Sequence, residues 1–189
     1  MKKLALSAAL VLLAAPAMAH PGHGASGLMA GLAHPVTGAD HLLAMLAVGL
    51  WSGFVLPRHV WAGAASFMAA MALGAGLSWA GIALPMVEMW ITASVAVFGL
   101  LTLLARRGQP AGMTGASLAA IALFAMCHGH AHATEATGNA LPYLVGFLSA
   151  TAALHLSGIA IARSIATGGL AQRAIGLGIT GAGLWMMAG

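Results

Sequence analysis

The chain has 189 residues, of which 61% are hydrophobic and only 5% are charged. A soluble domain carries roughly 25% charged residues, so this composition excludes a water-soluble protein and predicts a polytopic membrane protein. The formal net charge of +4 comes from scattered lysines and arginines, which form no basic patch of the kind that binds nucleic acid. The single cysteine, Cys127, excludes an internal disulfide.

Residues 1–19 have the three parts of a secretory signal peptide. Two lysines near the N-terminus precede a short apolar core and an Ala-Met-Ala cleavage site that ends at Ala19. Cleavage would leave His20 as the first residue of the mature chain, on the periplasmic side of a bacterial cytoplasmic membrane. The alternative is an uncleaved anchor helix, for which the apolar core is short.

The next residues, 20–27, form a periplasmic leader that contains His20 and His23. The α-amine and the imidazole of His20 can chelate a divalent cation, and His23 can add another nitrogen. Two solvated histidines at a mobile end are the alternative interpretation.

Residues 28–189 predict an all-α membrane domain of six transmembrane helices. The first apolar segment is longer than the ~20 residues that a span needs. Within it, Pro35 and Gly38 predict a break near His34-Pro35, followed by a spanning helix over about residues 36–55. The six apolar segments cover about residues 28–56, 60–84, 86–105, 115–132, 141–162 and 171–188.

The charges predict how this domain is oriented. With both termini outside, every Lys or Arg of the mature chain falls on the cytoplasmic side, as the positive-inside rule requires. The same topology places Glu88, the histidine cluster at residues 128–132 and Glu135 at the outer face. The arginines in question are Arg58, Arg106, Arg107, Arg163 and Arg173.

The first polar cluster lies where the first apolar segment begins and contains His34, Asp40 and His41. In a continuous helix the two histidines, seven residues apart, would share a face. Ionisable groups at membrane depth are costly and usually face a protein interior or a watery cavity, where they have a function. A structural polar cluster that pairs two helices is the alternative.

The second polar cluster ends the fourth apolar segment. On a helix, His128 and His132 are four residues apart and face the same way, with Glu135 one turn beyond. Histidines at this spacing form a two-ligand clamp for a transition metal, and the carboxylate can be a third ligand. His130 points away from this face. A histidine-rich rim that faces water is the alternative.

Two further ionisable residues stand alone in apolar segments. His155 lies well inside the fifth segment, where a hydrogen-bonded structural role is the alternative to a ligand role. Glu88 begins the third segment, where it could simply cap a helix. Taken together, the histidines and acids form a series from the outer surface inward. Imidazole and carboxylate ligands suit borderline divalent metals such as Ni, Co and Zn, and several modest sites in a row suit transport.

Four stretches carry a resemblance to a known family: HPVTGADHLLAMLAVGLW, HGHAH followed by Glu135, the region around Glu88, and the signal peptide that ends before HPGHG. They resemble the HupE/UreJ family of bacterial nickel, and in some members cobalt, permeases over essentially the whole chain. The resemblance implies a six-helix permease that supplies metal for hydrogenase and urease maturation. It also implies a metal path through His34, Asp40, His41, His128, His130 and Glu135.

We therefore expect a multi-pass permease of the bacterial inner membrane that is not an enzyme. Its cargo is Ni²⁺ or Co²⁺, and we expect no permanently bound cofactor. The expected partners are this metal ion and the lipid bilayer, with no nucleic acid; a homo-oligomer is compatible with the sequence. No phosphate-binding Gly-Lys-Ser/Thr loop is present, so we expect facilitated diffusion or proton coupling through Asp40 and His41.

Three other functions compete with this interpretation. A haem-binding electron-transfer subunit would use His41 and His155 as axial ligands. An intramembrane metalloenzyme would need an unrecognised site, because the sequence contains no H-E-x-x-H and no serine nucleophile motif. A copper permease would use the 12 methionines, for instance the pairs Met68/Met71 and Met86/Met89.

Overall fold

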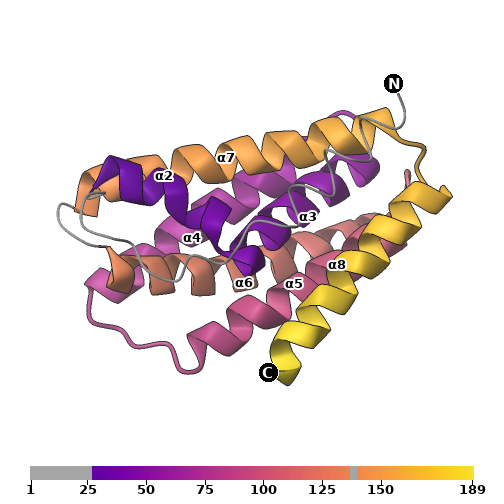
Figure 1. The fold of residues 1–189 in the computed structure, drawn as a ribbon. Helices are drawn as coiled ribbons and strands as arrows, with labels where there is room; N and C mark the ends of the chain where they lie inside the picture. The colour runs from indigo at the N-terminus through magenta and orange to yellow at the C-terminus, as the bar shows by residue number, and fades with distance from the viewer. Residues whose placement is uncertain (1–26, 137–139) are drawn as a thin grey trace.

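The computed structural model describes residues 27–136 and 140–189, and every regular element in these ranges is an α-helix (Figure 1). This confirms the all-α prediction. The signal peptide and the leader lie outside the described residues. The helices are α2 (Leu28–Thr37), α3 (Ala39–Val55), α4 (Ala62–Trp79), α5 (Val87–Leu104), α6 (Ala111–Glu135), α7 (Ala140–Ser164) and α8 (Leu170–Ala188).

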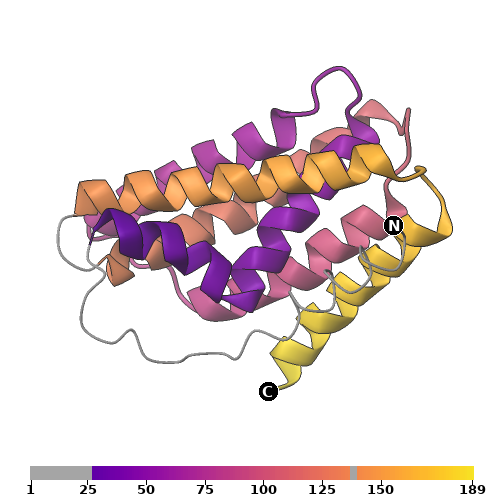
Figure 2. The same ribbon diagram turned by 45° about the horizontal axis from the view of Figure 1, so that its top comes forward.

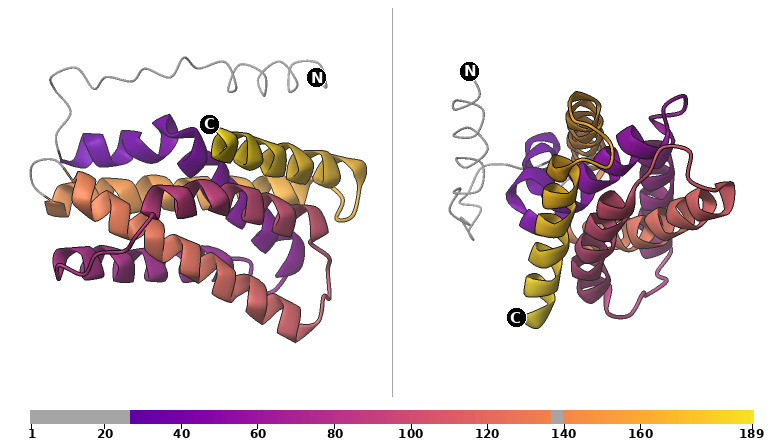
Figure 3. Two further views of the ribbon diagram at one scale, coloured as in Figure 1. Left: turned by 90° about the horizontal axis from the view of Figure 1, so that it is seen from below. Right: turned by 90° about the vertical axis from the view of Figure 1, so that its right-hand side faces the viewer.

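Most of these helices are long and apolar enough to cross a membrane. Among the described residues, α4, α5, α6 and α7 qualify singly, and α2 and α3 qualify together as one bent pair. The C-terminal helix α8 has 19 residues and is not among these candidate spans, so the sixth span stays a prediction. Figure 3 shows α8 at the edge of the bundle, where it packs against α5.

The break in the first segment lies at Gly38 and not near His34-Pro35, where the sequence predicted it. Pro35 lies inside α2 and does not end it, because a proline removes only one amide donor from the helix. The helix ends where the N–H of Gly38 bonds the carbonyl oxygen of His34, at 3.2 Å, and Gly38 itself is extended. The chain then turns by 81° into α3. His34 and His41 therefore lie on different helices, so the shared face that a continuous helix would give them does not form.

Glycines bring the helices together in pairs. In the pair α3 and α7, a Cβ atom on Gly49 or on Gly158 would overlap the backbone of the other helix. The same reciprocal fit joins α4 with α6 and α2 with α7, and three glycines of α5 and α8 join that pair. Such close approach suits a membrane, where van der Waals packing replaces the hydrophobic effect between helices. The other glycines are Gly74 and Gly129, Gly31 and Gly146, and Gly99, Gly176 and Gly183.

The bundle has two chemically different ends. The loops α3–α4, α5–α6 and α7–α8 lie together at one end, the arginine end, which is on the right in Figure 2. The exposed residues Arg58, Arg106, Arg107, Arg163 and Arg173 lie in these loops or in the adjoining helical turns. The opposite end, the histidine end, carries the α4–α5 loop, the end of α6 and the start of α7. The arginines thus share one end as predicted, whereas the side of the membrane that they face stays a prediction.

The close pairing predicts that added methyl groups act differently along α6. Gly129→Ala places a Cβ against the carbonyl oxygen of Met71, whereas Gly115→Ala in the same helix places its Cβ in open space. We expect Gly129→Ala to lower the free energy of unfolding by ~1–3 kcal/mol, the usual cost of overpacking. Gly115→Ala should leave it unchanged or raise it by up to ~1 kcal/mol. Thermal unfolding in detergent measures both, and equal effects would contradict the pairing.

Candidate functional site

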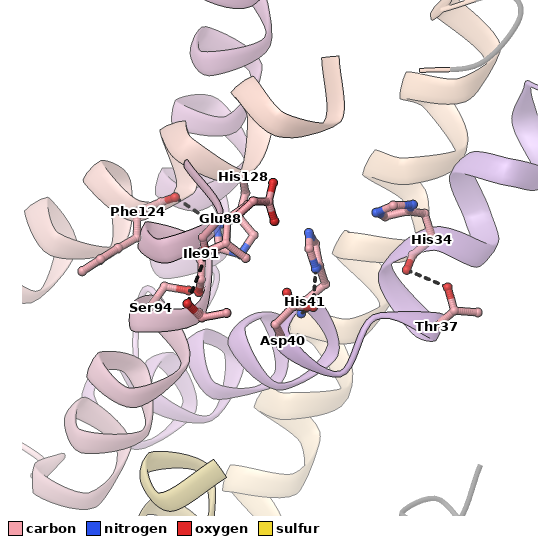
Figure 4. Close-up of polar contacts among 10 residues, drawn as sticks. His34, Thr37, Asp40, His41, Glu88, Ile91, Ser94, Phe124 and His128 are labelled. Carbon is pink, nitrogen blue, oxygen red and sulfur yellow. Dashed lines mark hydrogen bonds and ion pairs between the residues drawn. The ribbon is translucent and has the colours of Figure 1, made fainter. Parts of the chain in front are cut away.

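The site begins at the bend between α2 and α3. His34 lies in the last turn of α2 and His41 in the first turn of α3. The bend brings their rings to a centroid distance of 5.4 Å, edge to face. Figure 4 shows both imidazoles on the inner side of the bend. Two histidines from consecutive helices therefore meet, although they do not share one helix.

A third histidine reaches this pair from α6. The ring centroid of His132 lies 4.6 Å from that of His34 and 4.6 Å from that of His41. Each of the three residues offers a ring nitrogen, and these nitrogens all lie within 4.8 Å of one another. Three imidazoles that converge in this way can hold one transition-metal ion, whose bonds to nitrogen are about 2.0–2.1 Å long for zinc.

Asp40 holds the imidazole of His41 in a fixed orientation. The Nδ1 atom of His41 lies 2.6 Å from the Oδ1 atom of Asp40, which also accepts the backbone N–H of His41 at 2.8 Å. An ionised carboxylate only accepts hydrogen bonds, so Nδ1 carries the proton. In the neutral imidazole the Nε2 atom of His41 then carries no hydrogen and has a lone pair that can bind a metal. Carboxylate-held imidazoles of this kind are typical metal ligands.

Two more buried histidines repeat this arrangement with backbone carbonyl groups. His128 donates from Nδ1 to the carbonyl oxygen of Phe124 at 3.0 Å, and His155 donates to that of Met45 at 2.8 Å. The Nε2 atoms of His41, His128 and His155 are all buried and have no hydrogen-bond partner. A buried polar atom without a partner is costly, so three at once point to a ligand that they share or exchange.

These rings follow one another into the bundle. The His128 ring lies 5.2 Å from that of His41, and the Phe67 ring lies 5.4 Å from His128 and 5.0 Å from His155. Phe67, in α4, is fully buried and offers no ligand atom. Sequence analysis did not single it out, because a phenylalanine in an apolar segment carries no signal of its own. Thr151, one turn before His155 in α7, adds a buried hydroxyl without a partner.

Aromatic residues of α7 close the site at the histidine end. The ring of Phe147 lies 4.0 Å from that of His132, and Tyr143 lies 6.3 Å from His34. The cavity that His132 lines beside them has a volume of about 10 Å³, which is at most the space of a single water molecule. His41 and His132 are buried in this structure, whereas His34 is partly exposed.

Two other predicted residues, His130 and Glu88, do not join the three converging histidines. His130 turns away, as predicted, and its Nε2 atom lies 2.8 Å from the carbonyl oxygen of Ile82 in the α4–α5 loop. Glu88 is exposed in the first turn of α5, and in Figure 4 it lies on the His128 side of His41. Glu135 ends α6, and its side chain is outside what the structure describes, as are His20 and His23.

The burial of the second cluster contradicts one alternative drawn from the sequence. His128, His130 and His132 are all buried, so they do not form a rim that faces water. The spacing of His128 and His132 does place both rings toward His41, because residues four apart on a helix share a face. The structure thus brings α2, α3, α6 and α7 together around one set of imidazoles.

Comparison with known proteins places these features among relatives. A family model described as HupE / UreJ protein matches residues 8–186. Protein HupE of Rhizobium leguminosarum bv. viciae is 38% identical over 166 residues, which are 86% of this chain and 85% of that protein. No solved structure matches the chain.

The converging histidines predict a measurable metal affinity. Loss of a residue that only hydrogen-bonds a metal ligand weakens metal binding by about 10- to 100-fold. We expect His132→Ala to weaken binding of Ni²⁺ or Zn²⁺ by more than this, because it removes a direct ligand. His59→Ala, in the exposed α3–α4 loop, is the matched control and should bind normally. Isothermal titration of the purified protein measures both, and wild-type affinity in His132→Ala would contradict the site.

Proposed function

Because the chain belongs to the HupE/UreJ family, we propose that it is a permease that imports Ni²⁺ across the cytoplasmic membrane of a bacterium. The metal would serve the maturation of nickel enzymes such as hydrogenase and urease, and Co²⁺ is the second candidate cargo. One observation supports the proposal above the others. In three buried histidines, His41, His128 and His155, the Nδ1 atom is hydrogen-bonded to a fixed acceptor and the Nε2 atom has no hydrogen-bond partner.

The proposed path starts at the histidine end. His20 and His23 of the leader, with Glu88 and Glu135, would collect the hydrated ion. His34, His132 and His41 then replace its water, and the negative charge of Asp40 offsets part of its positive charge. The ion moves on to His128 and, past the ring of Phe67, to His155.

The ligand types favour nickel and cobalt over softer or harder ions. Neutral imidazole with a nearby carboxylate suits borderline divalent metals, whereas thiolates would bind them too tightly for release. The single Cys127 does not provide a thiolate site. Several similar sites with few ligands each allow an ion to bind and to leave, which transport requires.

The membrane potential suffices to drive this movement. Each positive charge gains about 2.3 kcal/mol per 100 mV on entering a negative interior, so a divalent ion gains about twice that. This direction requires the histidine end to face the periplasm and the arginine end the cytoplasm, which agrees with the positive-inside rule. A second energy source, such as proton coupling through Asp40 and His41, is then unnecessary.

The competing functions fit the site less well. A haem between His41 and His155 would have to displace His128 and Phe67, whose rings fill the space between them. The methionines proposed for a copper path are dispersed: Met71 is buried against α6, while Met86 and Met89 are exposed by 63% and 41%. No hydrolytic motif supports an enzyme.

Uptake of radiolabelled nickel by cells that express the chain tests the proposal. We expect uptake above that of empty cells, its loss in His41→Ala, and normal uptake in His59→Ala at equal expression. Competition by cobalt, zinc and copper ranks the cargo. Absence of uptake for any of these metals would contradict the permease, and a Soret absorption band in the purified protein would favour haem.

Proteoliposomes separate the two energy sources. With the potential clamped by potassium and valinomycin, we expect the initial rate of Ni²⁺ uptake to follow the imposed potential and to ignore the pH gradient. A rate that changes with the pH gradient at fixed potential would instead establish proton coupling. Asp40→Asn should then abolish this pH dependence.

A further inference from the structure

A second cavity lies at the arginine end, away from the histidines. It has a volume of about 720 Å³ and lies between the C-terminal half of α5 and the N-terminal half of α6. We call it the arginine-end groove. This volume falls within the about 300–1,000 Å³ of typical ligand sites. The groove is lined by Trp51, Leu101, Leu104, Arg106, Arg107, Gly108, Gln109, Pro110, Met113, Ala116, Ser117 and Ala120.

The groove exists because α5 and α6 belong to different glycine-packed pairs, α5 with α8 and α6 with α4. Large rings pack together where the middle of α6 meets α5. Phe124 of α6 lies 5.7 Å from Phe98 and 6.1 Å from Trp90, both of α5. Toward the arginine end three of the four α6 residues that line the groove, Ala116, Ser117 and Ala120, have small side chains, so the two helices leave space between them.

The mouth of the groove is positively charged. Arg106 and Arg107 line it side by side, and both are exposed. The N-terminus of α6 also opens here, because its cap residue, Pro110, makes no side-chain cap, and the free amides of a first turn attract anions. All three acidic residues of the chain, Asp40, Glu88 and Glu135, are remote from the arginine end. An anion that binds these arginines would therefore come from outside the chain.

The walls decide what kind of anion fits. Below the arginines most of the lining side chains are apolar, with the buried Trp51 of α3 behind them, and the hydroxyl of Ser117 is bonded to the carbonyl oxygen of Met113. Leu104 and Met113 at its edges are each exposed by 55%, on the side of α5 and α6 that faces out of the bundle. A water-soluble anion would leave these walls uncovered, whereas a lipid covers them with its acyl chain and offers a phosphate to the arginines.

We propose that the arginine-end groove binds one anionic phospholipid from the surrounding leaflet. Its phosphate lies between Arg106, Arg107 and the start of α6, and one acyl chain fills the space beside Ala116 and Ala120. The lipid thereby completes the contact between the α5–α8 and α4–α6 pairs. This inference is independent of the proposed metal transport.

Native mass spectrometry of the full-length protein in detergent, titrated with phosphatidylglycerol or phosphatidylcholine, tests the site. We expect one phosphatidylglycerol to bind more tightly than phosphatidylcholine. The double variant Arg106→Gln/Arg107→Gln should weaken this binding by about 30-fold, if each arginine contributes what a basic residue gains near an anionic lipid. The control Arg58→Gln/Arg163→Gln removes the same charge from the same end and should bind like the wild type.

Two further arms identify the ligand chemistry. Ala120→Leu narrows the apolar part without touching the arginines, and we expect it to weaken phosphatidylglycerol binding while leaving the oligomeric state unchanged. Glycerol 3-phosphate at equal concentration should not displace the lipid. Equal binding of the two lipids, equal loss in both double variants, or displacement by glycerol 3-phosphate would each overturn the proposal. A dimer that forms without lipid and that Ala120→Leu disrupts would assign the groove to a second copy of the chain.

Discussion

The carbonyl oxygen of His34 accepts two hydrogen bonds, from the backbone N–H of Gly38 and from the hydroxyl of Thr37, and this closes α2 just before the chain turns by 81°. Backbone polar groups at membrane depth must be satisfied by the protein, so a helix can be interrupted there only with such substitutes. The interruption puts the start of α3, with Asp40 and His41, inside the bundle. Without it His34 and His41 would stack along one helix and could not enclose an ion with a residue of α6.

The buried imidazoles depend on a second constraint, which is that each must be held in one tautomer. The Nδ1–H group of His41 is bonded to a carboxylate, and those of His128 and His155 are bonded to backbone carbonyl oxygens. Two of the three acceptors are therefore supplied by the backbone of the helices. The unpaired Nε2 atoms are costly in a dry interior. In the proposed path these atoms would accept the metal ion, which has to bind well enough to enter and weakly enough to leave.

Glycine pairing gives these polar groups a stable frame. The helices approach closely in the pairs α3 with α7, α4 with α6 and α5 with α8. This backbone-to-backbone packing stabilises the bundle without large apolar side chains between the paired helices. The boundary between two such pairs is less tightly packed. The rings of Phe98 and Phe124 pack across its middle, and the arginine-end groove lies beyond them.

The sequence by itself determined the class of the protein, since a chain with 5% charged residues cannot cover itself with a wettable surface. The lengths of the apolar segments approximately located α4 to α8, because in a membrane every span must satisfy its own backbone hydrogen bonds. Helical spacing also separated His128 and His132 from His130. These inferences succeed because they depend on local chemistry and on the solvent.

Only the tertiary structure decided which of these residues meet. The helix break was predicted near Pro35 but lies at Gly38. The end of α2 depends on hydrogen bonds to the carbonyl oxygen of His34 and on packing against α7, and not on the proline alone. Glu88 and Asp40 are both acidic residues in the first turn of a helix, but Glu88 is exposed on α5 and does not contact a histidine in the way that Asp40 does. Phe67 stands between His128 and His155 through the packing of α4 against its neighbours. Contacts between residues tens of positions apart depend on how helices pair, and no local pattern in the sequence contains that information.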